Sequence, residues 1–553
     1  MARHSKKILV LLAALAALVL GATALLCGSL NQDEGWYLYA AQLVRAGKLP
    51  YRDFFFTQGP TLPVVYSFLS PVWTSAASPL RGIIGGRAVS IAFGLAGIIA
   101  FAGAARALVA PARRFAAAFC VFAVLACNVY HVYFLTIPKT YALGSFFTGV
   151  GFYLFASALS RTGWRRGAQL AMAGLAMAFA SGTRISLVLM LGVRGFALLF
   201  NCRRYRNAFV WFGLGGAAGL FITYGAFALD PACLRGLLAA QEYHASRGGF
   251  DIMFAAGSLS RLARAYAGML AVLALVAADA VFRGAERPGE APGEGEGEGC
   301  DARFLVWTFG ASFAAVFLLQ LSAPFPYDDY QVPAMGLLAA VAAALFVRRL
   351  PAEGGPAQMR ACAFAFLAAC VVSFGSPQLQ RWFVAGQDRF WTIMKGRTDL
   401  SELRDAAAKV EALDPGGKTL FTQDLYLAVE CGRTVPEGLE MGPFSYFPEA
   451  FDIEAKALKV MNRQSMLELV DSAPCPVAAF SGYGFAVAAP KCDMVPYEDQ
   501  MELWERLKKR YSLAGAIQDF GQNDTTLLVL KRNEGDPAKA VEAEEGTPDG
   551  DSR

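Results

Sequence analysis

Long apolar runs dominate this sequence and leave few folds open to it. The first covers residues 8–26, and the others cover residues 83–109, 115–136, 141–160, 168–180, 185–200, 208–229, 266–281, 304–321, 332–347 and 361–374. Only 17% of the residues are charged, against about a quarter in soluble proteins. The pattern predicts an α-helical polytopic membrane protein with about eleven transmembrane helices, since a span needs about 20 apolar residues.

Basic residues between the runs predict how the chain crosses the membrane. Clusters such as Arg113/Arg114 and Arg203/Arg204 recur at every second connection, whereas the connections between them carry one cation, such as Arg184, or none. Cations gather on the cytoplasmic side of membrane proteins. We therefore expect the N-terminus to lie in the cytoplasm. The net charge of +5 does not indicate nucleic-acid binding, because the cations are dispersed in these small clusters.

The connection at Arg184 tests this topology most sharply. It separates two short runs, at residues 168–180 and 185–200, that could also form one long helix. Fusing them would place every later basic cluster outside the cytoplasm, against the rule. The charge pattern therefore favours two helices, and the resulting odd number of spans places the C-terminus outside.

The sequence divides into three parts. Residues 1–376 form the predicted transmembrane domain, which includes a first outer loop at residues 31–82. Residues 377–532 form a predicted extracytoplasmic α/β domain, because helical periodicity at 399–413, 425–431 and 500–511 alternates with short strand-like segments at 418–422, 476–480 and 525–531. Residues 533–553 form an acidic, alanine- and proline-containing tail that we expect to be disordered.

Cysteine usage adds one open question. Cys431, Cys475 and Cys492 lie in the predicted outer domain. Outside the cytoplasm one pair of them could be oxidised, and the sequence alone does not fix which pair. The chain contains no pair of cysteines separated by two residues, which argues against a structural zinc site.

The first outer loop gathers the side chains best suited to chemistry. Asp33 and Glu34 come a few residues after the first apolar run, and Asp53 follows later in the loop. Carboxylates at a membrane surface are costly unless they are solvated, paired or used in function. Glu34 and Asp53 could hold a divalent metal, although carboxylates alone leave the metal unknown.

Several segments resemble the GT-C glycosyltransferases, which use lipid-phosphate-linked sugars and include protein O-mannosyltransferases and the aminoarabinose transferase of lipid A. The similar segments are the acidic pair followed by Tyr37, GKLPYRD at 47–53, QGPTL at 58–62, GLAMAFASGTR at 174–184 and PYDDYQVP at 326–333. The chain departs from the pattern at Gln58, where relatives often carry lysine, and at Gly59, where they carry proline. A cation is therefore missing at position 58.

The resemblance implies transfer of a sugar from a polyprenyl-phosphate donor to a lipid, glycan or protein acceptor at the outer face of the membrane. Such a transfer needs a base for the acceptor hydroxyl and a cation for the leaving phosphate. Asp33 is the implied base, with Glu34 and Asp53 in support, and one displacement would invert the sugar. The implied phosphate-binding residues are Arg184, Lys139 and Arg87, and the implied substrate-binding residues are Tyr37, Gln58, Tyr327 and Asp328.

Other interpretations remain open at this stage. Asp33 and Glu34 could be a solvated helix end, and Arg184 could extend to the membrane surface. Asp328 and Asp329 could be solvated loop acids. A secondary transporter or lipid flippase is the rival function, although the sequence shows no internal repeat and its polar residues cluster at the outer surface. A non-catalytic assembly subunit with the same scaffold is the third possibility.

Overall fold

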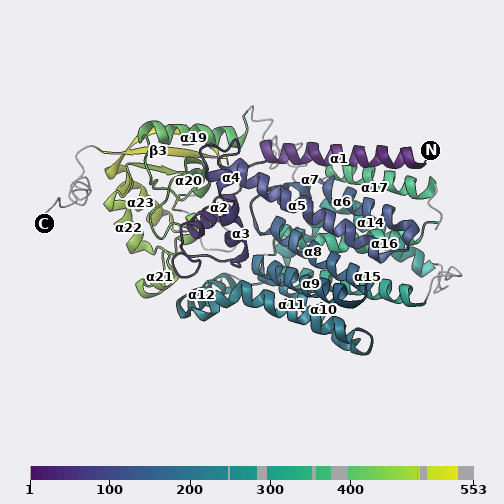
Figure 1. Ribbon diagram of the computed structural model, residues 1–553. Helices are drawn as coiled ribbons and strands as arrows, with labels where there is room; N and C mark the ends of the chain where they lie inside the picture. The colour runs from purple at the N-terminus through teal and green to yellow at the C-terminus, as the bar shows by residue number, and fades with distance from the viewer. Residues whose placement is uncertain are drawn as a thin grey trace.

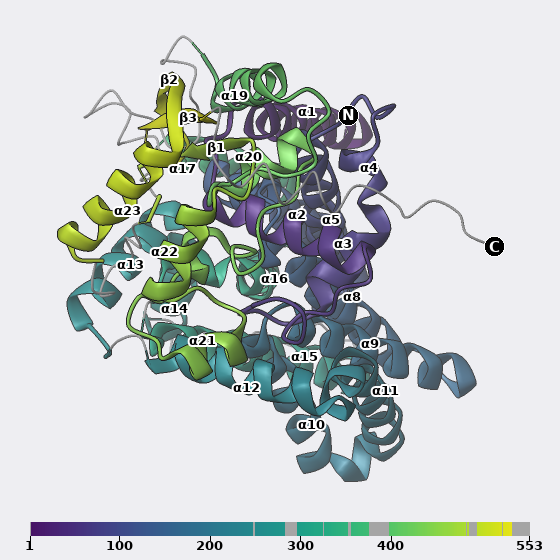
Figure 2. The same cartoon turned by 90° about the vertical axis from the view of Figure 1, so that its left-hand side faces the viewer.

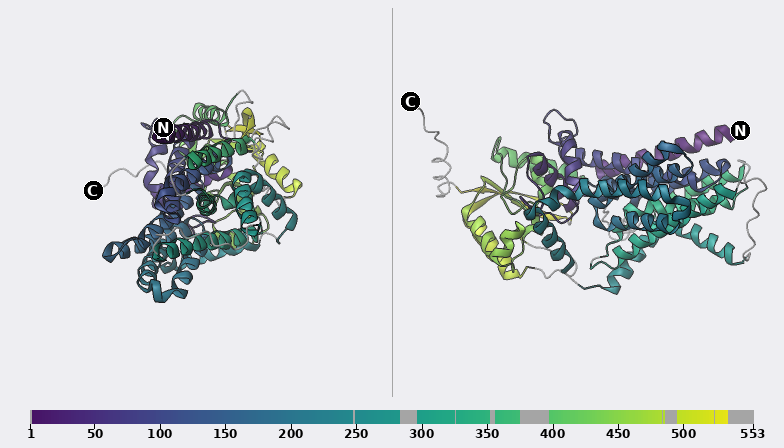
Figure 3. Two further views of the ribbon diagram at one scale, coloured as in Figure 1. Left: turned by 90° about the vertical axis from the view of Figure 1, so that its right-hand side faces the viewer. Right: turned by 60° about the horizontal axis from the view of Figure 1, so that its bottom comes forward.

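The computed structural model describes residues 2–246, 249–282, 296–324, 326–351, 356–374, 397–482, 484–485, 495–522 and 524–533. The molecule is elongated, with a bundle of long helices at one end and a domain of short helices and strands at the other (Figure 1). Figure 3 shows the same division from two further sides, with the N-terminus at the end of the bundle that lies away from this domain.

Among the described residues, seven helices are long and apolar enough to cross a membrane. They are α1 (Ala2–Cys27), α5 (Ile83–Ala105), α8 (Thr140–Leu159), α11 (Cys202–Leu229), α15 (Glu296–Leu321), α16 (Val332–Arg348) and α17 (Pro356–Phe374). Two bent pairs raise the number to nine if each pair is one span. The polytopic membrane fold is confirmed, whereas the expected count of eleven is not.

The bent pairs show where apolarity alone misleads. The run at 115–136 was expected to be one span, but it forms α6 (Arg114–Ala126) and α7 (Val129–Thr136), which meet at 70°. The bend follows from Asn128, whose side chain accepts a hydrogen bond from the N–H of His131 and so begins a new helix. The second pair, α13 (Ile252–Ala265) and α14 (Ala267–Phe282), meets at 87°.

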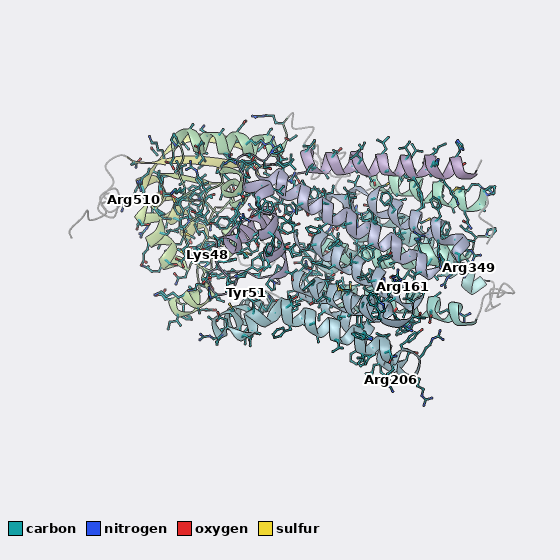
Figure 4. All side chains as sticks on the ribbon, viewed as in Figure 1. Lys48, Tyr51, Arg161, Arg206, Arg349 and Arg510 are labelled. Carbon is teal, nitrogen blue, oxygen red and sulfur yellow. The ribbon has the colours of Figure 1, made fainter. Side chains whose placement is uncertain are left out.

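The two-helix interpretation around Arg184 is confirmed. Helix α9 (Gly163–Thr183) ends where the backbone of Arg184 is extended, and a 3-10 turn, η3 (Ile185–Leu187), leads into α10 (Val188–Phe200). Figure 4 places Arg161, Arg206 and Arg349 at the end of the bundle away from the outer domain, and Lys48 near that domain. The three arginines, which belong to the predicted inner clusters, thus lie at one end of the bundle, as the positive-inside rule expects. The orientation in a cell stays a prediction.

The outer domain combines five described helices with a three-stranded sheet. The helices are α19 (Asp399–Leu413), α20 (Leu425–Cys431), α21 (Asp452–Leu458), α22 (Arg463–Ser472) and α23 (Tyr497–Arg510). The strands β1 (Val477–Phe480), β2 (Tyr511–Phe520) and β3 (Thr525–Arg532) are antiparallel in the order β1-β3-β2. The α/β class is therefore confirmed for this part of the chain.

Details of the outer domain differ from the sequence-based expectation. The segment at 418–422 forms only single bridges, such as that between Phe421 and Ala478, because the chain turns into α20 directly after it. Strand β2 was not anticipated. Cys431 and Cys475 are not bonded to each other. Cys492 lies outside the described residues, as do the expected domain boundary at 376–377 and nearly all of the tail.

Helix α2 (Gln32–Arg45) joins the two parts of the molecule. It lies between the outer domain and the bundle in Figure 1 and beside α20 in Figure 2. Its middle is buried against the outer domain. Trp36 contacts Phe444 with 4.4 Å between ring centroids, and the Tyr39 hydroxyl accepts a hydrogen bond from the N–H of Val435 at 2.9 Å. A Cβ at Gly35 would lie 2.2 Å from the backbone nitrogen of Tyr426, so only glycine permits this approach.

Candidate active site

The start of α2 fixes the directions of two neighbouring carboxylates. The side chain of Asn31 accepts a hydrogen bond from the N–H of Asp33, and the Glu34 carboxylate accepts one from the N–H of Asn31 at 2.9 Å, which makes a reciprocal cap. Successive helical residues point about 100° apart. Asp33 and Glu34 therefore face different surroundings.

Glu34 faces into the protein and meets Arg87 of α5. The guanidinium donates from Nε to Oε2 at 2.6 Å and from Nη2 to Oε1 at 2.7 Å, and it also bonds the carbonyls of Gly28 and Ser29. The two side chains are 0% and 1% exposed. The structure thus brings these two predicted site residues to each other, with both charges used inside the protein.

Asp33 faces a different cation, Lys139, at the junction of α7 and α8. Lys139 Nζ lies 2.5 Å from Asp33 Oδ2 and 3.0 Å from Asp329 Oδ2, and the Tyr141 hydroxyl donates to Asp329 at 2.8 Å. We call Asp33, Lys139, Tyr141 and Asp329 the Lys139 cluster. Burial alone would lower the pKa of Lys139, but the Asp329 and Asp33 carboxylates outweigh it and hold the pKa well above its ordinary value. The ammonium therefore stays charged.

Arg184 lies beside the Lys139 cluster. Its guanidinium carbon is 3.9 Å from the centroid of the Tyr330 ring and 5.6 Å from that of Tyr141. The N–H groups of the guanidinium form no hydrogen bond with any residue that the structure describes, whereas the backbone N–H donates to the carbonyl of Ala180. A guanidinium that is held by aromatic rings and keeps its donors unused suits recognition of a phosphate.

The first loop packs close to Arg184. A Cβ at Gly59 would lie 2.1 Å from the carbonyl oxygen of Gly182, which is near the end of α9. Gln58, the preceding residue, is half-buried, and its backbone carbonyl accepts a hydrogen bond from the Tyr51 hydroxyl. The glycine that departs from the family pattern therefore has a steric reason in this chain.

Tyr37 also borders the cluster, one helical turn after Asp33. The charges of Asp33, Lys139 and Arg184 all act on its hydroxyl, and burial raises the pKa of Tyr37, which keeps the phenol protonated. The Tyr327 ring contacts that of Tyr330 at 5.4 Å between centroids. Two predicted substrate-binding residues are thus brought near the Lys139 cluster.

Asp328 and Asp53 have other partners. Asp328, at the start of η4 (Asp328–Gln331), accepts from the Tyr130 hydroxyl at 2.8 Å and from Arg261 Nε at 2.9 Å. Asp53 accepts two hydrogen bonds from Arg52 at 2.9 Å and one from the N–H of Leu49 at 2.7 Å. The Arg52 guanidinium holds the pKa of Asp53 below its ordinary value, which makes this carboxylate a weak base.

Comparison with solved structures identifies the scaffold. The apo crystal structure of ArnT, an aminoarabinose transferase from Cupriavidus metallidurans, superimposes with a TM-score of 0.55 at 14% identity over 94% of this chain and 97% of its own. The chain has the GT-C fold. Two structures of the Archaeoglobus fulgidus oligosaccharyltransferase, one of them AglB with an inhibitory peptide and a dolichol-phosphate, match with TM-scores of 0.40 and 0.42 at 11% and 10% identity. They cover 83% and 85% of this chain and 71% and 69% of their own. Neither a family model nor a curated protein sequence matches the chain.

The donor residues that the structure describes do not fit a resident divalent metal. In the part of the chain that the structure describes, no group of three His, Cys, Asp or Glu side chains could hold one. Glu34 and Asp53 are each paired with an arginine, and Lys139 occupies the position between Asp33 and Asp329 where a cation would lie.

Sequence reasoning missed two members of the site, Tyr141 and Tyr330, and favoured a solvated loop position for a third, Asp329. Asp329 and Tyr330 lie in the polar segment before α16, where only Tyr327 and Asp328 were predicted to bind substrate. Tyr141 was counted only as the first residue of an apolar run. The available signal was the proximity of Lys139 and Tyr141 in sequence, directly after the apolar run that forms α7.

Proposed function

We propose that this chain is a membrane glycosyltransferase that moves a sugar from a polyprenyl-phosphate donor to an acceptor hydroxyl at the outer face of the membrane. The observation that carries the proposal is Lys139, which is shared by Asp33 and Asp329 and lies beside an arginine with unused donors. The GT-C fold, with the outer domain packed against the helix that carries Asp33, supports the same function.

In the proposed reaction, Arg184 and Lys139 bind the phosphate oxygens of the donor. Asp33 accepts the proton of the acceptor hydroxyl, the oxygen attacks the anomeric carbon, and the bond to the phosphate oxygen breaks with its electron pair. The lipid phosphate leaves with negative charge that the two cations stabilise. A single displacement of this kind inverts the sugar.

Sharing of Lys139 links donor binding to the proposed base. Without substrate, the Lys139 ammonium contacts the Asp33 carboxylate. A donor phosphate that attracts Lys139 loosens this contact, while Asp329 and Tyr141 keep the lysine in place. The Asp33 oxygen is then open to the acceptor hydroxyl.

The other predicted site residues take different roles in this proposal. Tyr37 and Tyr327 contact the sugar or phosphate, because they border the Lys139 cluster. Glu34 and Arg87 hold α2 on the bundle instead of acting on substrate. Asp53 stabilises the turn of the first loop, and Gln58 contributes its backbone to the same loop.

The test is transfer by Asp33→Asn and Lys139→Gln variants reconstituted with a polyprenyl-phosphate sugar. We expect a loss of about 100-fold or more for each, the usual range for a missing general base in Asp33→Asn and for a missing charge-stabilising group in Lys139→Gln, with insertion into the membrane unchanged. Asp53→Asn is the matched control and should transfer at the wild-type rate. Wild-type transfer by Asp33→Asn would remove this residue from the mechanism.

The acceptor and sugar can be found in cells. Loss of the protein should cause a lipid-linked sugar to accumulate and a surface glycan, lipid or protein to lose that sugar, both measured by mass spectrometry. Complementation with Asp33→Asn should fail to restore either pool. Unchanged pools in cells without the protein would contradict the proposed activity.

A further inference from the structure

Two side chains of the outer domain hydrogen-bond the backbone on either side of Asn31, the cap of α2. Asp399 Oδ2, at the start of α19, accepts from the N–H of Leu30 at 2.8 Å. Gln522 Oε1, in the turn between β2 and β3, accepts from the N–H of Gln32 at 2.9 Å. The start of α2 is therefore held by the outer domain as well as by its own cap.

The bond to Gln522 satisfies a group that the helix cannot satisfy itself, since the first N–H groups of an α-helix have no partner within it. In α2, the Glu34 carboxylate accepts from the N–H of Asn31, and the Asn31 side chain accepts from that of Asp33. The N–H of Gln32 lies between them, and Gln522 accepts from it. The capping of α2 is thus completed by a residue of the outer domain.

The same arrangement recurs at α5, the helix that carries Arg87. Its first N–H, that of Ile83, donates to Glu430 Oε2 of α20 at 2.8 Å, and a Cβ at Gly82 would lie 2.0 Å from the same oxygen. A carboxylate is favoured at the N-terminus of a helix. The outer domain therefore fixes the starts of both helices that carry Asp33 and Arg87.

The turn that carries Gln522 is itself held in place. Phe520 pairs with Thr525 across the hairpin, and its buried ring lies 5.7 Å from that of Tyr426. A Cβ at Gly521 would lie 2.4 Å from the Tyr426 hydroxyl, so the turn packs directly on α20. Gln522 therefore projects from a fixed part of the outer domain.

Asp33 lies in the turn of α2 that these bonds hold. Its Oδ2 is 2.5 Å from Lys139 Nζ, at the junction of α7 and α8. Helix ends fray, and their N–H groups need partners from outside the helix. A misplacement of about 1 Å in a reacting group can lower a rate about 100-fold. Release of the start of α2 would therefore displace Asp33, whereas Lys139 and Arg184 belong to other elements and would keep their places.

We propose that Gln522 is a positioning residue for sugar transfer, and that it acts by holding the N–H of Gln32 so that Asp33 is directed at Lys139 and at the acceptor hydroxyl. Asp399 supports it by holding the residue before the cap. The inference rests on the proposed function. It gives the outer domain a part in the reaction that requires no contact with the substrate.

The test compares Gln522→Ala and Gln522→Glu with wild type in the full-length protein. Three quantities are measured: kcat with the lipid-linked sugar that accumulates in cells without the protein, binding of undecaprenyl phosphate alone by native mass spectrometry, and hydrogen exchange of the backbone at residues 30–36. For Gln522→Ala we expect kcat to fall about tenfold, the effect of one net hydrogen bond. Exchange should become faster, and binding of undecaprenyl phosphate should stay unchanged.

Two variants control for a general effect on the hairpin. Gln522→Glu keeps an acceptor oxygen of the same reach beside a helix N-terminus, so kcat should stay within about twofold of wild type. Gln518→Ala removes an exposed glutamine of β2 that accepts from the Thr526 hydroxyl at 2.7 Å. It should match wild type in all three measurements.

A wild-type kcat in Gln522→Ala, or weaker binding of undecaprenyl phosphate by it, would overturn the positioning role. A fall in kcat that Gln518→Ala shares, or that Gln522→Glu does not recover, would also overturn it, because the stability of the hairpin would then explain the loss. The proposed function fails separately, if wild type transfers no sugar. Hydrogen exchange still decides in that case whether Gln522 holds the start of α2, since unchanged exchange in Gln522→Ala would show that it does not.

Discussion

Asp33 and Glu34 are chemically equivalent neighbours that the fold uses in opposite ways. Glu34 is 0% exposed and both its oxygens bond one arginine, whereas the Asp33 side chain is 17% exposed and shares one lysine with a second acid. The helix turns them in different directions, and burial then decides the outcome. A residue type and its position in a motif therefore do not determine its role.

The surroundings of Glu34 and Asp33 differ in how many hydrogen-bond donors remain for a ligand. Arg87 donates hydrogen bonds to Glu34 and to carbonyls at the end of α1, so the buried Glu34–Arg87 pair has few donors left for a ligand. Near Lys139, three charged groups share one space with Arg184, whose donors are unused by the described residues. Here, a charged group whose hydrogen bonds are all made within the protein indicates a structural role. Charged groups that share one partner indicate a site for substrate.

The largest expected effect comes from breaking the buried Glu34–Arg87 pair. Arg87→Met should lower the free energy of unfolding by about 3–5 kcal/mol, because it leaves the Glu34 carboxylate buried without a cation. Asp33→Asn should change stability far less, since Lys139 keeps Asp329. Thermal unfolding in detergent measures both. The double variant Glu34→Gln/Arg87→Met should recover part of the loss, and equal destabilisation by Asp33→Asn and Arg87→Met would contradict the contrast drawn between the two acids.

Glu440 offers a third arrangement, a buried carboxylate without a bonded cation among the described residues. It is 3% exposed, and its Oε2 accepts from the N–H of Gly438 at 2.8 Å. Burial raises the pKa of Glu440 to about 7 from the ordinary 4.5. The folded state therefore holds a proton that the unfolded chain releases, and stability falls as the pH rises from 4.5 through 7.

Glu440→Gln should remove this pH dependence. Wild type should lose about 2–3 kcal/mol of stability between pH 5 and pH 8 at this site, from about 1.4 kcal/mol for each pH unit across the interval. The variant should unfold at a higher temperature than wild type at pH 8 and at nearly the same temperature at pH 5. A difference that is equal at both pH values would mean that the carboxyl does not titrate in this range.

Gly35 lies one residue beyond the two acids and tests how the outer domain holds them. Gly35→Ala places a Cβ 2.2 Å from the backbone nitrogen of Tyr426, which should cost about 1–3 kcal/mol and reduce transfer by displacing Asp33. Gly310→Ala is the matched control, since a Cβ there meets nothing within 4 Å. Full activity and stability in Gly35→Ala would show that α2 can shift without consequence.

The sequence could predict the membrane class, the break at Arg184 and the α/β outer domain, because these follow from local apolarity, charge and periodicity. It also placed Asp33, Lys139 and Arg184 among the candidates. It could not show which acid meets which cation, since Asp33 and Lys139 are brought together only by the packing of α2 over the bundle. The role of Asp329 escaped for the same reason. The bend at Asn128 escaped because a local helix cap interrupts an otherwise continuous apolar run.

The smallest expected effect concerns Asp53, the third acid of the first loop. Its pair with Arg52 is largely open to solvent, with side-chain exposures of 30% and 41%, and such pairs contribute little to stability. Asp53→Asn keeps an oxygen that can accept from the N–H of Leu49, so the turn should persist, the unfolding temperature should not change, and transfer should stay within about twofold of wild type. A large loss of transfer with unchanged folding would place Asp53 beside the substrate. The contrast between Glu34 and Asp33 would then not explain the role of Asp53.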